Sequence, residues 1–176
     1  MKKSDDKRYA IALEKLMDVI RRWPCNPVGG YWHKMHHVNE MWLDGLYMAG
    51  PLEAEYSATF GEQCYIETAI EQIILMRDHI QDPETKLLYH AWDPTKEIDW
   101  ADAETGLSEE FWGRALGWYV VAILDILELL YHLKKKYYYQ HLHFYTLILH
   151  ILLPQALAFS LRRAPCEVNV LYRQVL

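Results

Sequence analysis

Apolar residues recur every three to four positions in two stretches of the chain, which predicts helices over residues 5–22 and 62–80. The stripes consist of Ile11, Leu13, Leu16, Met17 and Ile20 in the first stretch, and of Ile66, Ala69, Ile70, Ile73 and Ile74 in the second. Ser4 or Asp5 can cap the first helix, and Pro24 ends it.

Two further helices are predicted from residues that typically begin or end a helix. One begins at Asn39 or Glu40 and ends at Gly61, with a kink or break at Gly50-Pro51. The other covers residues 109–133, where Ser108 is the expected N-cap and acidic residues fill the first turn.

The intervening segments are expected to be loops. Residues 24–31 are dense in Pro and Gly, and residues 81–107 contain turn signals beside one short extended piece. No strand is long enough to anchor a sheet. The chain is therefore predicted to be all-α, built from helical hairpins joined by alternating short and long loops.

Length and composition narrow the class of protein. A chain of 176 residues with 52% hydrophobic residues suits one globular domain, and a net charge of -6 argues against nucleic-acid binding. The cysteines Cys25, Cys64 and Cys166 are interpreted as free thiols. The start, MKKSDDKRYA, lacks the apolar region of a signal peptide, and location in the cytoplasm or the periplasm stays open.

The composition changes abruptly after residue 131. Six basic residues and one acidic residue follow it, whereas the first 131 residues carry 12 bases and 23 acids. We expect a domain over residues 1–131 and an atypical helical tail over 132–176. Three interpretations of the tail are a membrane-associated helix, a buried helix or a shifted reading frame near Lys134. The short apolar run argues against a membrane span, and the change in composition favours the frameshift.

Polar and aromatic side chains gather in three segments, at residues 31–47, 88–93 and 111–119. Their conspicuous members are His33, His36, His37, Trp42, Asp44 and Tyr47, then His90, Trp92 and Asp93, then Trp112, Arg114, Trp118 and Tyr119. The histidines do not follow the HExxH pattern, so no metal site is predicted. Asp99 and Asp102 are interpreted as turn residues.

Asp44 and Arg114 each have two interpretations. Asp44 lies near a helix start, where its charge can interact favourably with the helix dipole. It can also act as a proton-transferring carboxylic acid among aromatic rings, and the residues alone support the two interpretations about equally. Arg114, with Trp118 four residues later on the same helical face, either binds a substrate carboxylate or stacks as structural filler.

Three motifs in register carry a family resemblance. The segments WLDGLYMAGP, LLYHAWD and FWGRALGWY resemble glycoside hydrolase family 105, the unsaturated rhamnogalacturonyl hydrolases, and the related family 88 of unsaturated glucuronyl hydrolases. The resemblance covers about residues 33–125. It implies a six-hairpin (α/α) barrel, of which 176 residues can form only a part, because twelve helices with their loops need roughly 200 residues.

The resemblance also implies a reaction and a set of site residues. The substrate would be an unsaturated uronyl oligosaccharide, with a C4=C5 double bond at its non-reducing end. Asp44 would protonate C4, water would add at C5, and the resulting hemiketal would open to release the next sugar. The substrate contacts would be His33, His90, Trp112, Arg114 and Trp118, with no metal or organic cofactor.

Two alternatives to an active hydrolase stay open. The family's second important aspartate belongs to an earlier hairpin, so the chain is expected to be a truncated product that binds sugar weakly without turnover. The other alternative is a membrane-associated or interaction protein driven by the tail.

Overall fold

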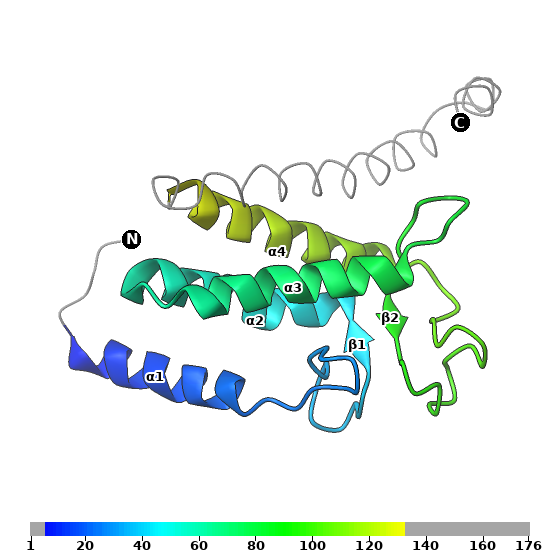
Figure 1. The fold of residues 1–176 in the computed structure, drawn as a ribbon, viewed down its shortest axis with the longest axis horizontal. Helices are drawn as coiled ribbons and strands as arrows, with labels where there is room; N and C mark the ends of the chain where they lie inside the picture. Colours follow the sequence, from blue (N-terminus) through cyan, green and yellow to red (C-terminus); the bar gives the residue numbers. More distant parts are fainter. Residues whose placement is uncertain (1–5, 133–176) are drawn as a thin grey trace, which may run out of the picture.

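Four helices form most of the computed structural model, which describes residues 6–132. They are α1 (Lys7–Arg21), α2 (Leu43–Phe60), α3 (Gln63–Ile80) and α4 (Gly113–His132). Helices α2, α3 and α4 lie side by side, and the short strands β1 (Met41–Trp42) and β2 (Ala91–Trp92) lie at one end of them (Figure 1). The predicted all-α class is confirmed. Beyond its first residue, the predicted tail lies outside the described residues.

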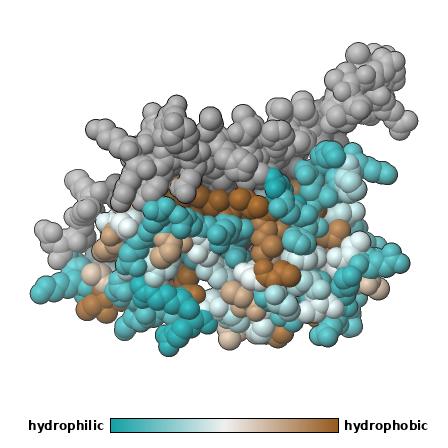
Figure 2. All heavy atoms as spheres, viewed as in Figure 1, coloured by the Kyte–Doolittle hydropathy of each residue, from teal (hydrophilic) through white to brown (hydrophobic). Residues whose placement is uncertain are grey.

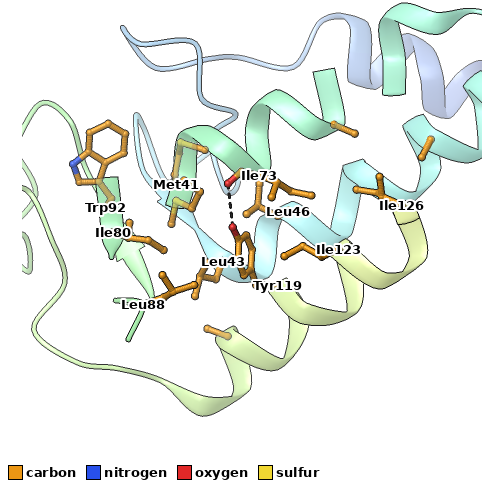
Figure 3. Packing of buried hydrophobic residues seen from close by; sticks show 14 of the residues in the cluster. Met41, Leu43, Leu46, Ile73, Ile80, Leu88, Trp92, Tyr119, Ile123 and Ile126 are labelled. Atoms are coloured by element: carbon orange, nitrogen blue, oxygen red, sulfur yellow. Dashed lines mark hydrogen bonds between the residues drawn. The ribbon is translucent and has the colours of Figure 1, made fainter. Parts of the chain in front are cut away.

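The hydrophobic core lies between α2, α3 and α4. Helix α2 packs against both α3 and α4. Leu43, Ile73 and Ile123 are fully or almost fully buried between them, and the hydroxyl of Tyr119 donates a hydrogen bond to the carbonyl of Ile73 at 3.1 Å (Figure 3). This bond satisfies a polar group that would be costly to bury alone.

Hydrophobic surface also gathers along the α4 side of the described body (Figure 2). Val121 and Leu124 of α4 are among its exposed large hydrophobic residues. No helix among residues 6–132 is long and apolar enough to cross a membrane.

The predicted start of the second helix is wrong by three to four residues. Met41 and Trp42 form β1, which pairs antiparallel with β2, and α2 begins only at Leu43. The amide of Leu43 still donates to the carbonyl of His90 at 3.0 Å. Pairing between distant segments has therefore replaced the first helical turn that the local sequence favours.

Of the kink or break expected at Gly50-Pro51, the break is wrong, because α2 runs unbroken from Leu43 to Phe60. A Cβ added to Gly50 would lie 3.2 Å from Cδ1 of Ile126 on α4. Gly50 thus permits close packing of two helices, and this packing supports α2 where Pro51 cannot donate a backbone hydrogen bond.

Ser108 is not the N-cap of the fourth helix, which begins at Gly113. The hydroxyl of Ser108 accepts from the amide of Ala91 at 3.2 Å, and its amide donates to the carbonyl of Ala91 at 3.0 Å. Ser108 therefore pairs with β2, and residues 109–112 are not part of the helix.

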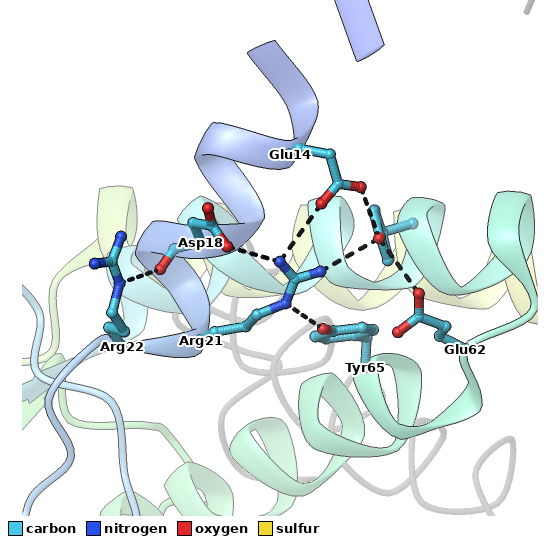
Figure 4. Close-up of polar contacts among 7 residues, drawn as sticks. Glu14, Asp18, Arg21, Arg22, Glu62 and Tyr65 are labelled. Atoms are coloured by element: carbon cyan, nitrogen blue, oxygen red, sulfur yellow. Dashed lines mark hydrogen bonds and ion pairs between the residues drawn. The ribbon is translucent and has the colours of Figure 1, made fainter. Parts of the chain in front are cut away.

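Helices α1 and α3 agree with their predicted ranges to within two residues. Asp6 is the N-cap of α1, and its side chain accepts from the amide of Arg8. At the other end of α1, Arg21 donates to the hydroxyls of Tyr65 at 2.7 Å and of Tyr56 at 3.3 Å (Figure 4). These bonds join α1 to α2 and α3.

Two turns of matching chemistry shape the long segment between α3 and α4. In each, an aspartate accepts from a threonine hydroxyl three residues later: Asp82 from Thr85 at 2.5 Å and Asp102 from Thr105 at 2.7 Å. Asp102 is thus the turn residue that its sequence predicted.

Candidate active site

Asp44 lies in the first turn of α2, close to where the two short strands pair. Its side chain is only 10% exposed, and its Oδ1 accepts from Nε of Arg114 at 3.2 Å. Its Oδ2 is buried and has no hydrogen-bond partner among the described residues. One carboxyl oxygen of Asp44 is therefore left available for chemistry.

Arg114 joins Asp44 to the surface of the site. Its side chain is 54% exposed, and its guanidinium carbon lies 3.6 Å from the centre of the Trp112 ring. Arg114 therefore stacks on a tryptophan while part of its side chain faces solvent, and binding of a substrate carboxylate stays a prediction. The stacking partner is Trp112, whereas Trp118 packs on Tyr47 with ring centres 4.8 Å apart.

A continuous series of ring contacts runs from His33 to Trp112. His33 stacks on Trp42 at 4.7 Å, with ring planes 6° apart, and Trp42 meets the ring of His90 edge-on at 5.6 Å. His90 in turn meets Trp112 edge-on at 5.5 Å. The pairing of β1 with β2 makes this series possible, because it brings Trp42 and His90 together.

The structure thus brings the predicted site residues into one region. His33, His90, Trp112, Arg114 and Asp44 are linked by the contacts above, and Trp118 lies one helical turn after Arg114. Trp112 and Trp118 are 40% and 37% exposed, so their rings can meet a ligand. The catalytic and binding roles of these residues stay predictions.

His33 is held as a neutral ring. Burial, with a smaller contribution from the charges of Lys34 and His37, lowers the pKa of His33 to about 4. Its Nδ1 is buried without a hydrogen-bond partner among the described residues. At neutral pH the ring is therefore uncharged, and it can offer a donor or an acceptor to a sugar hydroxyl.

The sequence did not reveal two buried residues that support this region. Glu40 accepts from Nε1 of Trp42 at 2.8 Å and lies 3.1 Å from Nδ1 of His37. Glu53 accepts from the hydroxyl of Tyr31 at 2.8 Å. The position of Glu53 in the helix could have indicated its burial, because it falls on the same helical face as Leu46, Gly50 and Ser57, all of which are buried.

No group of three or more His, Cys, Asp or Glu side chains within residues 6–132 could hold a metal ion. His36 and His37 instead pack against each other with ring centres 4.5 Å apart. The site offers a buried carboxyl group, a partly exposed guanidinium and exposed aromatic faces. Such groups can transfer a proton, bind a carboxylate and stack on a sugar ring.

Comparison with known proteins places this arrangement in a family. Residues 1–155 match the family model of Glycosyl Hydrolase Family 88. The unsaturated rhamnogalacturonyl hydrolase YesR of Bacillus subtilis is 34% identical over 91 residues, which is 52% of this chain and 24% of that protein. Protein Atu3128 of Agrobacterium fabrum is 32% identical over 83 residues, which is 47% of this chain and 35% of that protein.

Solved structures agree with this placement. A glycoside hydrolase from family 105 of C. acetobutylicum is 41% identical with a TM-score of 0.67, over 70% of this chain and 34% of that one. A possible family 105 member from Salmonella enterica, 23% identical, shares the fold with a TM-score of 0.68, over 86% of this chain and 39% of that one. The resemblance seen in the three motifs and the predicted partial barrel are confirmed.

The chain spans between 24% and 39% of the length of these four relatives. The family match covers 155 of its 176 residues and extends past the predicted boundary at residue 131. This chain therefore belongs to Glycosyl Hydrolase Family 88 and shares the fold of the family 105 glycoside hydrolases.

Proposed function

We propose that this chain carries the active-site segment of a glycoside hydrolase for oligosaccharides that end in an unsaturated uronic acid. The observation that carries the proposal is the buried carboxyl group of Asp44, which has one oxygen bound by Arg114 and the other without a partner. The B. subtilis relative is an unsaturated rhamnogalacturonyl hydrolase, which supports a substrate derived from rhamnogalacturonan.

The proposed reaction is hydration of an enol ether. Asp44 gives a proton to C4, and the positive charge that forms at C5 is shared with the ring oxygen. Water adds to C5 and returns a proton to the Asp44 carboxylate, which leaves a hemiketal. Opening of the hemiketal gives a ketone at C5 and a hemiacetal at C1, and collapse of that hemiacetal to an aldehyde releases the next sugar. This route needs one acid-base group and no protein nucleophile.

Arg114 and the tryptophans are proposed to bind the substrate. The guanidinium contacts Asp44 through Nε, and its exposed part can bind the uronic acid carboxylate beside the reacting double bond. The exposed rings of Trp112 and Trp118 can pack against the sugar. His33, at the other end of the ring series, and His90, beside Trp112, are proposed to contact sugar hydroxyls.

Ultraviolet absorbance of the C4=C5 bond tests the proposal. Incubation of the folded chain with lyase-treated rhamnogalacturonan should remove the absorbance, and Asp44→Asn should abolish the loss while Asp102→Asn leaves it intact. A folded chain that leaves the absorbance unchanged refutes activity on these oligosaccharides. An Asp44→Asn variant as active as the parent refutes the assignment of the acid.

The exposed rings of Trp112 and Trp118, the first of them stacked on Arg114, favour a second candidate, which is sugar binding without turnover. Calorimetry with the same oligosaccharides separates the two functions. Heat of binding that is lost in Arg114→Ala, together with unchanged absorbance, supports the second candidate. Heat that is unchanged in that variant contradicts it.

A further inference from the structure

Tyr31 ties the loop before β1 to two helices at once. Its hydroxyl donates to Oε1 of Glu53 on α2 at 2.8 Å, and its amide donates to Oε1 of Gln72 on α3 at 2.8 Å. Nε2 of Gln72 also donates to the carbonyl of Gly29 at 2.9 Å. The loop is thus fixed by side chains from both helices.

Glu53 is an unusual residue for a helix core. The residue is 1% exposed, and its Oε2 is buried without a hydrogen-bond partner among the described residues. A cavity of about 20 Å³ lies beside it, lined in part by Tyr31, Trp32 and Gly45. Burying a carboxyl group with an unpaired oxygen costs free energy that an apolar residue would not cost. Packing alone therefore does not explain a glutamate at this position.

The held loop leads directly to the active-site region. His33 follows Tyr31 by two residues, and its amide donates to the carbonyl of Glu40 at 2.7 Å. A Cβ added to Gly45 would lie 3.1 Å from Nδ1 of His33. Gly45 is next to Asp44 in the chain, so the position of His33 is set against the turn that carries the proposed acid.

We propose that Glu53 is a positioning residue. Through the hydroxyl of Tyr31 it holds in place the loop before β1, which also carries His33. The contact lies on the side of α2 that faces the loop, and Glu53 acts through Tyr31 without touching the substrate. The proposal rests on the proposed function only for the role of His33 in substrate binding.

The titration of His33, followed by NMR of its ring in the full chain, tests the proposal. The pKa of His33 is lowered to about 4 mainly by burial, so the midpoint reports whether the ring keeps its place. Tyr31→Phe and Glu53→Leu should move the midpoint toward 6.5, by about one pH unit or more. Glu53→Gln keeps an acceptor for the hydroxyl and should restore the midpoint near that of the parent chain.

Tyr9→Phe is the matched control, since Tyr9 is 67% exposed on α1 and its ring lies on the surface. A His33 midpoint in Tyr31→Phe equal to that of the parent would overturn the proposal. Tyr31→Phe loses a single hydroxyl, so it decides the question even where Glu53→Leu fails to fold.

Kinetics give a second readout where the parent chain turns over substrate. Tyr31→Phe should lower kcat/KM roughly tenfold, because small displacements of binding groups are costly to catalysis, and Glu53→Gln should stay near the parent. Unchanged kcat/KM in Tyr31→Phe would contradict the role in catalysis. Absence of turnover in the parent refutes the proposed function, whereas the His33 titration still tests the positioning role.

Discussion

The buried carboxyl group of Glu53 should make the stability of this chain depend on pH. Burial raises the pKa of Glu53 from 4.5 to about 7 in the folded chain, and the hydrogen bond from Tyr31 offsets only part of that rise. The unfolded chain has the ordinary value. Between the two values the folded chain keeps a proton that the unfolded chain has released. The free energy of unfolding contributed by Glu53 is therefore fully present below pH 4.5 and is lost as the pH rises through about 7.

Glu53→Gln isolates this contribution. Glutamine keeps the size of the side chain and an acceptor for Tyr31, but it cannot titrate. Since one pH unit corresponds to about 1.4 kcal/mol, the variant should gain about 3 kcal/mol over the parent chain between about pH 4.5 and pH 7.5. His33 acts in the opposite direction, because its pKa is lowered to about 4 and its contribution is lost as the pH falls. Both chains contain His33, so this contribution cancels in the difference.

Urea unfolding followed by tryptophan fluorescence at a series of pH values measures the difference, provided that the transitions are two-state. Glu71→Gln, an exposed carboxyl group on α3, controls for the loss of one charge. A difference between Glu53→Gln and the parent that stays flat from pH 4.5 to pH 7.5 would refute the reasoning. So would a difference that falls as the pH rises.

Five further substitutions, in three tests, probe the site, the core and two glycine positions. Arg114→Lys keeps the charge but loses the planar group, so oligosaccharide affinity measured by calorimetry should weaken about tenfold. The free energy of unfolding in urea should change by less than about 1 kcal/mol, because the Arg114 side of the ion pair is half exposed. Ile123→Ala should cost about 2–5 kcal/mol in urea unfolding and Leu124→Ala far less, since these neighbours are 0% and 49% exposed; equal losses would contradict the described core. Gly61→Ala should cost about 1 kcal/mol for its φ of 79° alone, and Gly106→Ala more, since its added methyl would also collide with a backbone carbonyl; thermal unfolding of the two variants gives their order.

Helical periodicity predicted most of the fold because the core of this chain is helix on helix. The stripe of Ile66, Ala69 and Ile73 became the buried face of α3, and Gly61 ended α2 in a left-handed conformation with φ 79°. These signals depend on residues three or four positions apart, which lie side by side once the segment forms a helix. Local reasoning was therefore sufficient for the elements and for their faces.

The errors fall where distant segments pair. Ser108 has the residue type of an N-cap, yet its amide and hydroxyl bond to Ala91, which is 17 residues away. Met41 and Trp42 were assigned to a helix because nothing in their own segment signals that β2 pairs with them. Glu53 was overlooked for the same reason, because its partner Tyr31 is 22 residues earlier. In each case a contact between distant residues outweighs the local preference.

Contacts between residues far apart in the sequence, which local patterns do not predict, also assemble the candidate site. Asp44 reaches Arg114 across 70 positions, and the ring of His90 reaches Trp42 because two residues of β1 pair with two of β2. A two-stranded pair of this length is not stable alone, so its register depends on the helices that carry its ends. Substitutions in the core between α2 and α4 should therefore alter the spacing of Asp44 and Arg114 as well as stability. The six residues proposed for the site therefore stay close together only while that core holds.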